Sequence, residues 1–376
     1  MRILQITAAL EQGGVERGTV EMAAFIVSQG GQSFVASQGG RMVKELEEGG
    51  TRHFLLPLAS RNPLTILYSA WQLRKIIRRE KIDLLHARSR APAWAAYFAG
   101  KMTGVKMVTT FHGTHRIQNS VKKWYNSVMV RGVRVIAISQ FIKNHILQNY
   151  IANEDVIDVA PRGFNPTLFD PGLISAGQRQ ALKQQLGLAA GIAVVSLPGR
   201  LTRWKGQILF LEALAQIKDL EWQALLIGGG GTKTAYIKEL KMRVEKLGIA
   251  DRVLFVGSQE DIVPYYAISD LVVSASTEPE AFGRVAVEAQ AMAKPIIASA
   301  HGGSLETVKD GETGWLFNNG DSADLADKLR IALSGDIDLT RVGISGRQWV
   351  AENYTIDKMC QGEWNAYLKV PGFNNN

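Results

Sequence analysis

Two glutamates are the first residues whose type and spacing could support chemistry. Residues 278–295 read EPEAFGRVAVEAQAMAKP and place Glu280 and Glu288 eight positions apart around a Phe-Gly pair. Such carboxylates could form an acid/base pair, hold a metal ion, grip hydroxyl groups or remain as solvated charge. The metal interpretation is the weaker one, because no Asp or His stands at a short companion spacing. Glu288 lies in an Ala/Val-rich helix, so its charge needs a partner.

Cationic residues precede this pair in the segment VVSLPGRLTRWKGQ. Arg200 and Lys205 follow an apolar strand directly, so we expect them on a loop at the carboxyl end of that strand. The helix that starts near Gly283 can present the amides of Phe282 and Gly283 to an anion. Two cations and a helix start form a site of the size of a diphosphate. The alternative for each segment is surface charge on a loop.

A run of four glycines, residues 228–231, fits no nucleotide motif. Lys233 stands where the third glycine of G-x-G-x-x-G would fall, and Thr232 precedes it where a P-loop has glycine. Gly229 is therefore expected only in a turn that approaches a ligand closely.

The first half of the chain offers a second group of candidates. The segment LEQGGVERG places Gly14 at a turn before a helix, and TFHGTH places His112 after a strand. His112 could donate a hydrogen bond, act as a base or contact a sugar, or it could only cap a turn. The segment HARSR adds His86, Arg88 and Arg90, which we expect at the same rim.

These residues need a scaffold, and the hydrophobic pattern predicts two doubly wound parallel sheets in tandem. Strands and helices alternate in both halves, and the strands are continuous apolar runs, as in sheets covered on both faces. We expect strands at 2–6, 33–37, 53–56, 82–86, 106–110 and 134–138, and then at 193–197, 223–227, 253–256, 271–274 and 295–298. Expected helices span 16–28, 64–80, 91–102 and 118–130, and then 206–217, 234–247, 262–268, 283–292, 322–334 and 357–369.

The pattern breaks at PRGFNPTLFDPGLISAG, a stretch rich in Pro and Gly that is typical of a linker. We therefore expect a first domain at 1–165, a linker at 166–176, a second domain at 177–353 and a terminal helical segment at 354–370. In open α/β sheets ligands sit outside the carboxyl ends of the strands, so two such edges facing each other would make a cleft.

Composition and charge indicate the cellular location and the kind of partner to expect. The single cysteine, Cys360, excludes a disulfide framework, and no apolar run of eighteen residues occurs, so a cytoplasmic location is expected. Residues 1–165 hold 22 Lys and Arg against 11 Asp and Glu, whereas the remainder holds 21 against 24. The basic half indicates an anionic partner, although a merely solvated basic face is an equal alternative.

Residues 117–134 are the candidate membrane contact in that half. A stripe at helical spacing is formed by Ile117, Val121, Trp124, Tyr125, Val128 and Gly132, and the basic residues Lys122, Lys123 and Arg131 lie off that stripe. A basic amphipathic helix of this kind can lie in a membrane interface, and packing on the sheet is the competing interpretation. Nucleic-acid binding is not expected, because no reader motif is recognisable.

Taken together, these segments resemble the GT-B glycosyltransferases of family GT4. The resemblance covers most of the chain and rests on GGVER, IDLLHARS, TFHG, PRGFNPTLF, GRLTRWKG, EPEAFGRVAVE and GGSLETVKDGETGWLF in that order. Glu280 and Glu288 match the E-x7-E motif of the family. One segment departs from it, since the family more often shows Asn-Gly-Val-Asp where this chain has RGFN at 162–165.

The resemblance implies a retaining enzyme that transfers a hexosyl unit from a nucleoside-diphosphate sugar, with no essential metal and no other cofactor. Its acceptor would be lipid-linked or a lipopolysaccharide. The last helix would cross back to the first domain. The implied contacts are Arg200 and Lys205 with the diphosphate, Glu280 with sugar hydroxyls, Glu288 with the ribose, Phe282 and Gly283 through their backbone, Gly14 with the diphosphate and His112 with the donor sugar.

Two rivals remain open. A GT-B sugar-nucleotide epimerase would release an epimerised sugar nucleotide without an acceptor, and its signature residues are not evident. A non-catalytic protein that only binds a sugar nucleotide would not need the intact set of Arg200, Lys205, Glu280 and Glu288.

Overall fold

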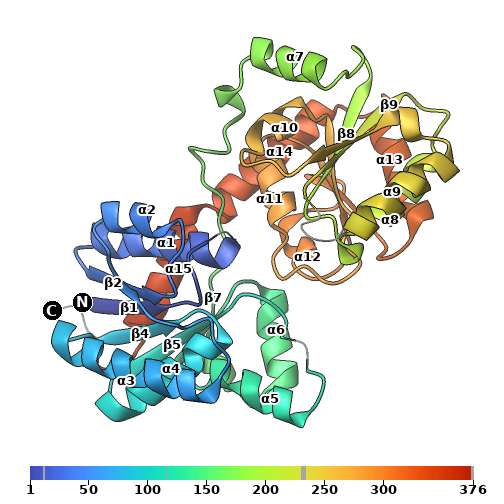
Figure 1. Ribbon diagram of the computed structural model, residues 1–376. Helices are drawn as coiled ribbons and strands as arrows, with labels where there is room; N and C mark the ends of the chain where they lie inside the picture. The colour runs from blue at the N-terminus through green and yellow to red at the C-terminus, as the bar shows by residue number, and fades with distance from the viewer. Residues whose placement is uncertain (12, 116, 230–233, 374–376) are drawn as a thin grey trace. The chain divides into compact units, whose positions relative to one another are not determined.

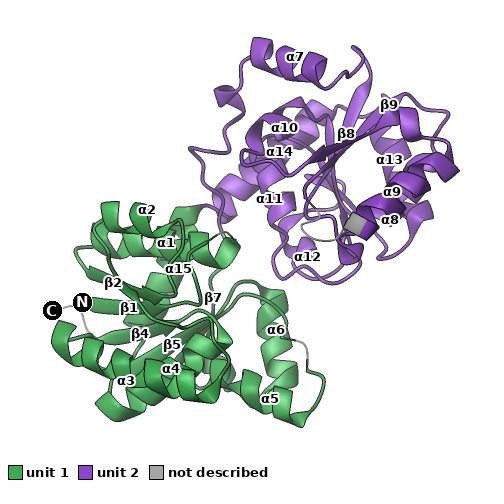
Figure 2. Ribbon diagram, viewed as in Figure 1, with its two compact units in different colours: residues 1–162, 356–376 green, residues 163–355 purple. Residues whose placement is uncertain are grey.

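The computed structural model divides into two compact units (Figure 2), and it describes residues 1–11, 13–115, 117–229 and 234–373. Unit 1 comprises Met1–Arg162 and Ile356–Asn376, and unit 2 comprises Gly163–Thr355. The boundary therefore lies between Arg162 and Gly163. Residues 166–176, expected as a linker, belong to unit 2, and the last helix belongs to unit 1.

Unit 1 is built on a seven-stranded parallel sheet of order β3-β2-β1-β4-β5-β6-β7. Its strands are β1 Arg2–Ile6, β2 Gln32–Ser37, β3 Arg52–Leu55, β4 Leu84–Ala87, β5 Lys106–Phe111, β6 Arg134–Ala137 and β7 Ile157–Val159. Its helices are α1 Gly14–Ser28, α2 Val43–Glu48, α3 Pro63–Glu80, α4 Arg90–Thr103, α5 Ser120–Asn126, α6 Gln140–Asn149 and α15 Ile356–Leu368. The strand order reverses at β1 and β4, which defines the doubly wound topology.

Two pairs of helices cover this sheet (Figure 1). α3 packs against α4, and α1 packs against α15, which comes from the far end of the chain. The core under α15 joins apolar residues of four strands to those of the helix, among them Ile3, Leu84, Val108, Ile136 and Met359. The terminal helix is therefore part of the first unit's core.

Unit 2 has a six-stranded parallel sheet of order β10-β9-β8-β11-β12-β13. Its strands are β8 Ala193–Pro198, β9 Trp222–Ile227, β10 Val253–Gly257, β11 Leu271–Ser274, β12 Ile296–Ser299 and β13 Gly314–Phe317. Its helices are α7 Ala176–Gln185, α8 Gln207–Ala215, α9 Thr234–Leu247, α10 Val263–Ile268, α11 Arg284–Ala291, α12 Ser304–Thr307, α13 Ser322–Leu333 and α14 Leu339–Asn353. The strand order again reverses between β8 and β11, so loops after these strands meet at one edge.

The expected helix at 118–130 is only partly correct. α5 ends at Asn126 and is followed by a 3-10 turn at Ser127–Val130. Val121 and Trp124 are 72% and 58% exposed, so the predicted stripe is not wholly a core stripe. Among the described residues, no helix combines the length and apolar character needed to cross a bilayer.

Candidate functional site

Three loops of unit 2 converge at the carboxyl edge of its sheet, after β8, β11 and β12. The loop after β8 touches the end of β11 at Gly206, whose φ is +72° and whose hypothetical Cβ would lie 1.8 Å from the carbonyl oxygen of Ala275. The amide of Thr277 donates to the carbonyl of Trp204 at 2.7 Å. Only glycine permits this approach, so Gly206 places the preceding residue, Lys205, beside the β11 loop.

Lys205 and Glu280 form an ion pair at this junction. Their side chains are 14% and 15% exposed, and the hydroxyl of Ser276 donates to Glu280 Oε1 at 2.6 Å. The loop after β12 completes the junction, since the amide of Gly303 donates to the carbonyl of Glu280 at 2.8 Å. Glu280 is therefore held by all three loops, and its carboxylate is oriented before any ligand arrives.

His301 and two glycines form the third loop. His301 Nε2 lies 2.8 Å from the carbonyl oxygen of Ser276, and within the part of the chain that the structure describes its Nδ1 is buried without a hydrogen-bond partner. A Cβ at Gly302 would lie 2.5 Å from the carbonyl oxygen of Glu280, and one at Gly303 would lie 2.4 Å from Cα of Phe282. The residue types at 301–303 are therefore dictated by the β11 loop that they touch.

The start of α11 lies next to Glu280. Gly283 is the N-cap in a left-handed conformation with φ +88°, and it supplies no side-chain cap. The first turn of the helix therefore directs its amides and positive dipole end toward the loop. Phe282 is buried and packs edge-on against Tyr354, with 5.4 Å between ring centroids. This packing fixes the chain where the helix begins.

Glu288 has two partners, as its apolar setting requires. Arg284 Nη2 lies 2.6 Å from Glu288 Oε1, and the hydroxyl of Tyr266 donates to Glu288 Oε2 at 3.1 Å. Burial, followed by the charge of Glu288, raises the pKa of Tyr266 well above its ordinary value. Tyr266 thus stays a neutral donor, and Glu288 is a carboxylate held at 13% exposure.

The remaining residues predicted for unit 2 lie on the same edge. Arg200 is exposed on the loop after β8. The carbonyl of Gly229 accepts a hydrogen bond from the amide of Leu201 at 3.1 Å, so the β9 loop follows the β8 loop. A Cβ at Gly228 would lie 2.0 Å from the carbonyl oxygen of Gly199, which explains the glycine there. Residues 230–233 of the glycine run lie outside the described residues.

In unit 1, His112 follows β5 at the carboxyl edge of the sheet. Its Nε2 is buried and has no hydrogen-bond partner among the described residues. Burial, then the positive charges of Arg162 and Arg88, holds the pKa of His112 well below its ordinary value. His112 is therefore a neutral imidazole whose spare ring nitrogen can meet a ligand hydroxyl.

Gly14 begins α1 and accepts a hydrogen bond from Arg162 through its carbonyl. Arg162 is only 6% exposed, and its guanidinium also covers Gly18, where a Cβ would lie 2.2 Å from Nη1. Arg162 stands where the family more often has another residue, and Gly18 leaves the space that its guanidinium occupies. Arg162 in turn holds the carbonyl of Gly14.

The expectation that His86 and Arg88 line the rim is wrong. Both are fully buried, and Arg88 makes a two-pronged ion pair with Glu363 of α15 at 3.1 and 2.6 Å. His86 lies 2.6 Å from the hydroxyls of both Thr110 and Tyr367. These side chains anchor the terminal helix. Arg90 also turns inward, and its Nη1 donates to Asn126 at 3.0 Å.

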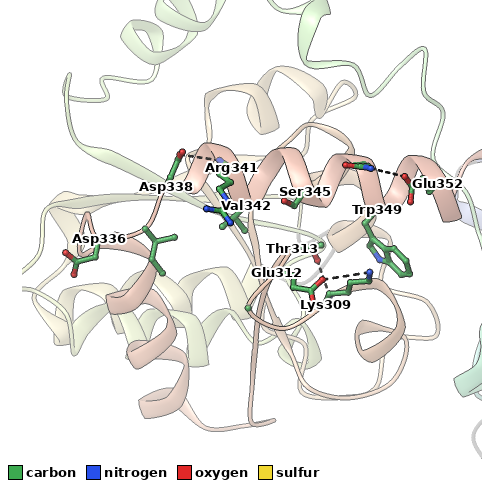
Figure 3. A pocket seen from close by; sticks show the side chains of 13 residues that line it. Lys309, Glu312, Thr313, Asp336, Asp338, Arg341, Val342, Ser345, Trp349 and Glu352 are labelled. Carbon is green, nitrogen blue, oxygen red and sulfur yellow. Dashed lines mark hydrogen bonds and ion pairs between the residues drawn. The ribbon is translucent and has the colours of Figure 1, made fainter.

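A cavity of about 570 Å³ lies elsewhere in unit 2, between the loop at 309–313 and α14 (Figure 3). Lys309 Nζ lies 4.0 Å from the ring centroid of Trp349 and 3.9 Å from Glu312 within it. The predicted site residues do not line this cavity. Among the described residues, no three His, Cys, Asp or Glu side chains are placed to hold one metal ion.

Two doubly wound parallel units, each with candidate ligand residues at the carboxyl ends of its strands, have the GT-B fold, the fold of one large class of glycosyltransferases. The family model for glycosyl transferases group 1 matches residues 178–349, and the model for glycosyltransferase family 4 matches residues 12–168. N-acetyl-alpha-D-glucosaminyl L-malate synthase of Bacillus anthracis is 30% identical over 309 residues, which cover 80% of this chain and 78% of that protein. The chain belongs to glycosyltransferase family 4.

Solved structures agree with this assignment. A glycosyltransferase from Rickettsia africae superposes with a TM-score of 0.91 at 36% identity, and the match covers 99% of this chain and 98% of that one. The Anabaena protein HepE, solved in complex with UDP-glucose, superposes with a TM-score of 0.83 at 25% identity over 97% and 98% of the two chains. The chain is therefore an enzyme of the glycosyltransferase class.

Proposed function

We propose that this enzyme transfers a hexosyl unit from a nucleoside-diphosphate sugar to a membrane-associated glycan acceptor, with retention of the anomeric configuration. The arrangement around Glu280 carries the proposal. A lysine, a fixed carboxylate and a helix start meet at one sheet edge, in a chain similar to a protein solved with UDP-glucose.

The donor chemistry follows from charge. Arg200, Lys205 and the start of α11 stabilise the negative charge that develops on the departing nucleotide. Glu280 binds hydroxyls of the sugar, and Glu288 binds the ribose. The neutral His112 offers its unpaired Nε2 to the sugar. No side chain is assigned as a nucleophile, so the acceptor hydroxyl oxygen bonds to the anomeric carbon on the face that the nucleotide leaves. The bond from that carbon to the diphosphate oxygen breaks, and the leaving diphosphate takes the acceptor proton.

The acceptor side rests on surface chemistry. A cavity of about 420 Å³ in unit 1 is lined by the apolar Trp124, Val130 and Ile151 together with the cationic Lys123 and Arg131. Ile151 and Trp124 are 101% and 58% exposed. Apolar and cationic groups side by side suit a lipid-linked or lipopolysaccharide acceptor at an anionic membrane surface. Replacing Lys122, Lys123 and Arg131 with glutamate is expected to reduce binding to anionic vesicles, and unchanged binding would remove this part of the proposal.

The donor assignment is tested by binding and hydrolysis. A thermal-shift panel of UDP-, GDP- and ADP-sugars should show one nucleotide that raises the melting temperature. The wild type should hydrolyse that donor slowly, and Lys205→Ala should lower the rate at least about tenfold, because it removes a cation from the leaving group. Hydrolysis unchanged in Lys205→Ala would contradict the assignment.

The rivals give different products in the same assay. An epimerase would convert the sugar nucleotide to its epimer with no acceptor present, whereas a non-catalytic binding protein would show a thermal shift and no turnover. Retention is read from the anomeric configuration of the transferred sugar by NMR, and an inverted product would overturn the same-face mechanism.

A further inference from the structure

Helix α3 carries a row of large apolar side chains that face away from unit 1. Leu64, Leu67, Tyr68 and Trp71 are 76%, 52%, 52% and 45% exposed. Their spacing puts them on one face of the helix. The packed face is made by a separate set, Ile66, Ser69, Ala70, Leu73, Ile76 and Ile77. The exposed row is therefore not needed for the core.

The same face becomes cationic toward the end of the helix. Lys75 and Arg78 continue the row one and two turns beyond Trp71, and both are exposed. Lys75 Nζ lies 3.4 Å from the ring centroid of Trp71, so the cation sits directly over the aromatic side chain. Glu80, the single acidic residue of α3, is engaged by Arg52 and Arg79 at 3.1 and 2.7 Å. The exposed face thus has an apolar half and a basic half with no negative charge between them.

The apolar and basic residues on this face of α3 suit an anionic membrane as the partner. Leucine, tyrosine and tryptophan beside lysine and arginine are the composition of helices that lie in the interface of an anionic bilayer. A second copy of this chain is a poor partner, because the opposed faces would bring like charges together. Residues 1–165 alone carry 22 basic against 11 acidic residues.

The apolar half of α3 lies near the edge of unit 1 that carries His112. α3 follows β3 directly, so its first turns lie toward the carboxyl ends of the strands, the edge at which β5 presents His112. We propose that α3 lies in the plane of an anionic membrane, with Leu64, Leu67, Tyr68 and Trp71 inserted and Lys75 and Arg78 on the lipid headgroups. This inference rests on the proposed membrane-associated acceptor and assigns its docking element to α3.

Flotation of the full-length protein with vesicles tests it. The vesicles are phosphatidylcholine alone or mixed with phosphatidylglycerol. The wild type should float with the mixed vesicles, and Leu67→Gln/Trp71→Gln and Lys75→Gln/Arg78→Gln should each lower the bound fraction about tenfold. Met242→Gln is the matched control, because Met242 is 65% exposed on a basic helix of unit 2 and should float like the wild type.

Each outcome separates α3 from the rest of the proposal. If both α3 variants float like the wild type, the inference is overturned. If only the Lys122/Lys123/Arg131 variant loses vesicle binding, the membrane contact lies in residues 117–134 and not on α3. If the protein is a dimer without lipid and the α3 variants are monomers, the inference is overturned as well, since the apolar row would then be a self-association surface. The donor thermal shift, measured on the same samples, shows whether the donor proposal stands when vesicle binding fails.

Discussion

The two glutamates of the E-x7-E motif hold different partners, which indicates different tasks. Glu280 is fixed by Lys205 and Ser276 at the meeting point of three loops, whereas Glu288 is fixed by Arg284 and Tyr266 one turn and more inside α11. Neither is a solvated charge. In the described part of the chain the two carboxylates have different side-chain partners, so each substitution removes a different set of contacts.

We therefore expect unequal effects of their removal. Glu288→Ala should weaken nucleotide binding about tenfold, because in the proposed function Glu288 is the acceptor for the ribose hydroxyls. Glu280→Ala should leave nucleotide binding nearly unchanged and lower turnover at least about tenfold, because the proposal assigns Glu280 to the sugar. Calorimetric titration with the nucleoside diphosphate and kcat measurements check this. Tyr266→Phe is a control that retains the carboxylate. Equal loss of nucleotide affinity in both alanine variants would contradict the division.

Metal dependence is a second prediction at the residue scale. In the proposed function, Arg200, Lys205 and the start of α11 supply the positive charge that a diphosphate requires. Turnover should therefore be the same after EDTA treatment and after addition of Mg²⁺ or Mn²⁺. Loss of more than about half of the activity on chelation, restored by one of these ions, would require a metal in the donor complex.

Sequence reasoning predicted that the segments of the candidate site share one sheet edge, but it did not predict the side-chain pairs between them. The motifs placed Lys205 and Glu280 at the same edge, yet their ion pair depends on Gly206 touching Ala275 from another strand. Ser276 and His301 carried no signal beyond their position next to the motifs. Arg88 was expected at the rim because it stands at the end of a predicted strand, but its partner lies 275 positions away on α15.

At the scale of elements, α15 is fastened to unit 1 by a buried charge pair. Arg88 and Glu363 are 1% exposed each, and Arg88 Nε also donates to Gln5 at 2.7 Å. A buried guanidinium that loses its carboxylate has no other compensation of charge. The helix thus contributes stability through one ion pair as well as through its apolar face.

Glu363→Ala should therefore cost about 3–5 kcal/mol in the free energy of unfolding. Chemical denaturation monitored by circular dichroism measures it. The double variant Arg88→Met/Glu363→Leu is the control, because replacing both partners with apolar side chains should recover most of the loss. If Glu363→Ala unfolds at the same denaturant concentration as the wild type, the pair does not hold the helix.

The elements differ in how far the sequence predicts them. The strands at 2–6 and 271–274 were located at their observed bounds, because each contains a short apolar run. The short strands β7 and β13 were missed, and so were helices α2, α6, α7, α12 and α14. α14 contains Gly343 and Gly346, which read as helix breakers, but a Cβ at these positions would lie 2.1 Å from the carbonyl oxygen of Ala293 and 3.0 Å from Gln290. Close packing of α14 on α11 requires them, and tertiary contacts cannot be read from local propensity.

For the whole molecule, the two units differ in their histidines. Five of the six lie in unit 1, and only His301 lies in unit 2. Burial lowers the pKa of all five. The pKa values of His86 and His112 lie well below 6.5, and that of His115 is about 3. His53 and His145 are less completely buried, and their pKa values are also lowered. Folded unit 1 therefore keeps neutral imidazoles that its unfolded chain would protonate.

The sign of the effect follows from proton binding. Below about pH 6.5 the unfolded chain binds more protons than the folded unit, so the free energy of unfolding falls as the pH falls. Each histidine that stays neutral contributes a slope of up to about 1.4 kcal/mol per pH unit. For His115 this window extends from about pH 6.5 to about 3. Unit 1 should consequently lose stability between pH 6.5 and 5 more steeply than unit 2.

Hydrogen exchange followed by mass spectrometry at several pH values resolves the two units, because peptides from 1–162 and 163–355 report on them separately. After correction for the intrinsic pH dependence of exchange, protection of the unit 1 core strands should fall first as the pH is lowered. His115→Phe should flatten that slope, since phenylalanine cannot take up a proton in the unfolded chain and can keep the ring contact with Phe111, whose centroid lies 5.1 Å from that of His115. Loss of protection in both units at the same pH, or an unchanged slope in His115→Phe, would show that the buried histidines do not set the acid limit of the fold.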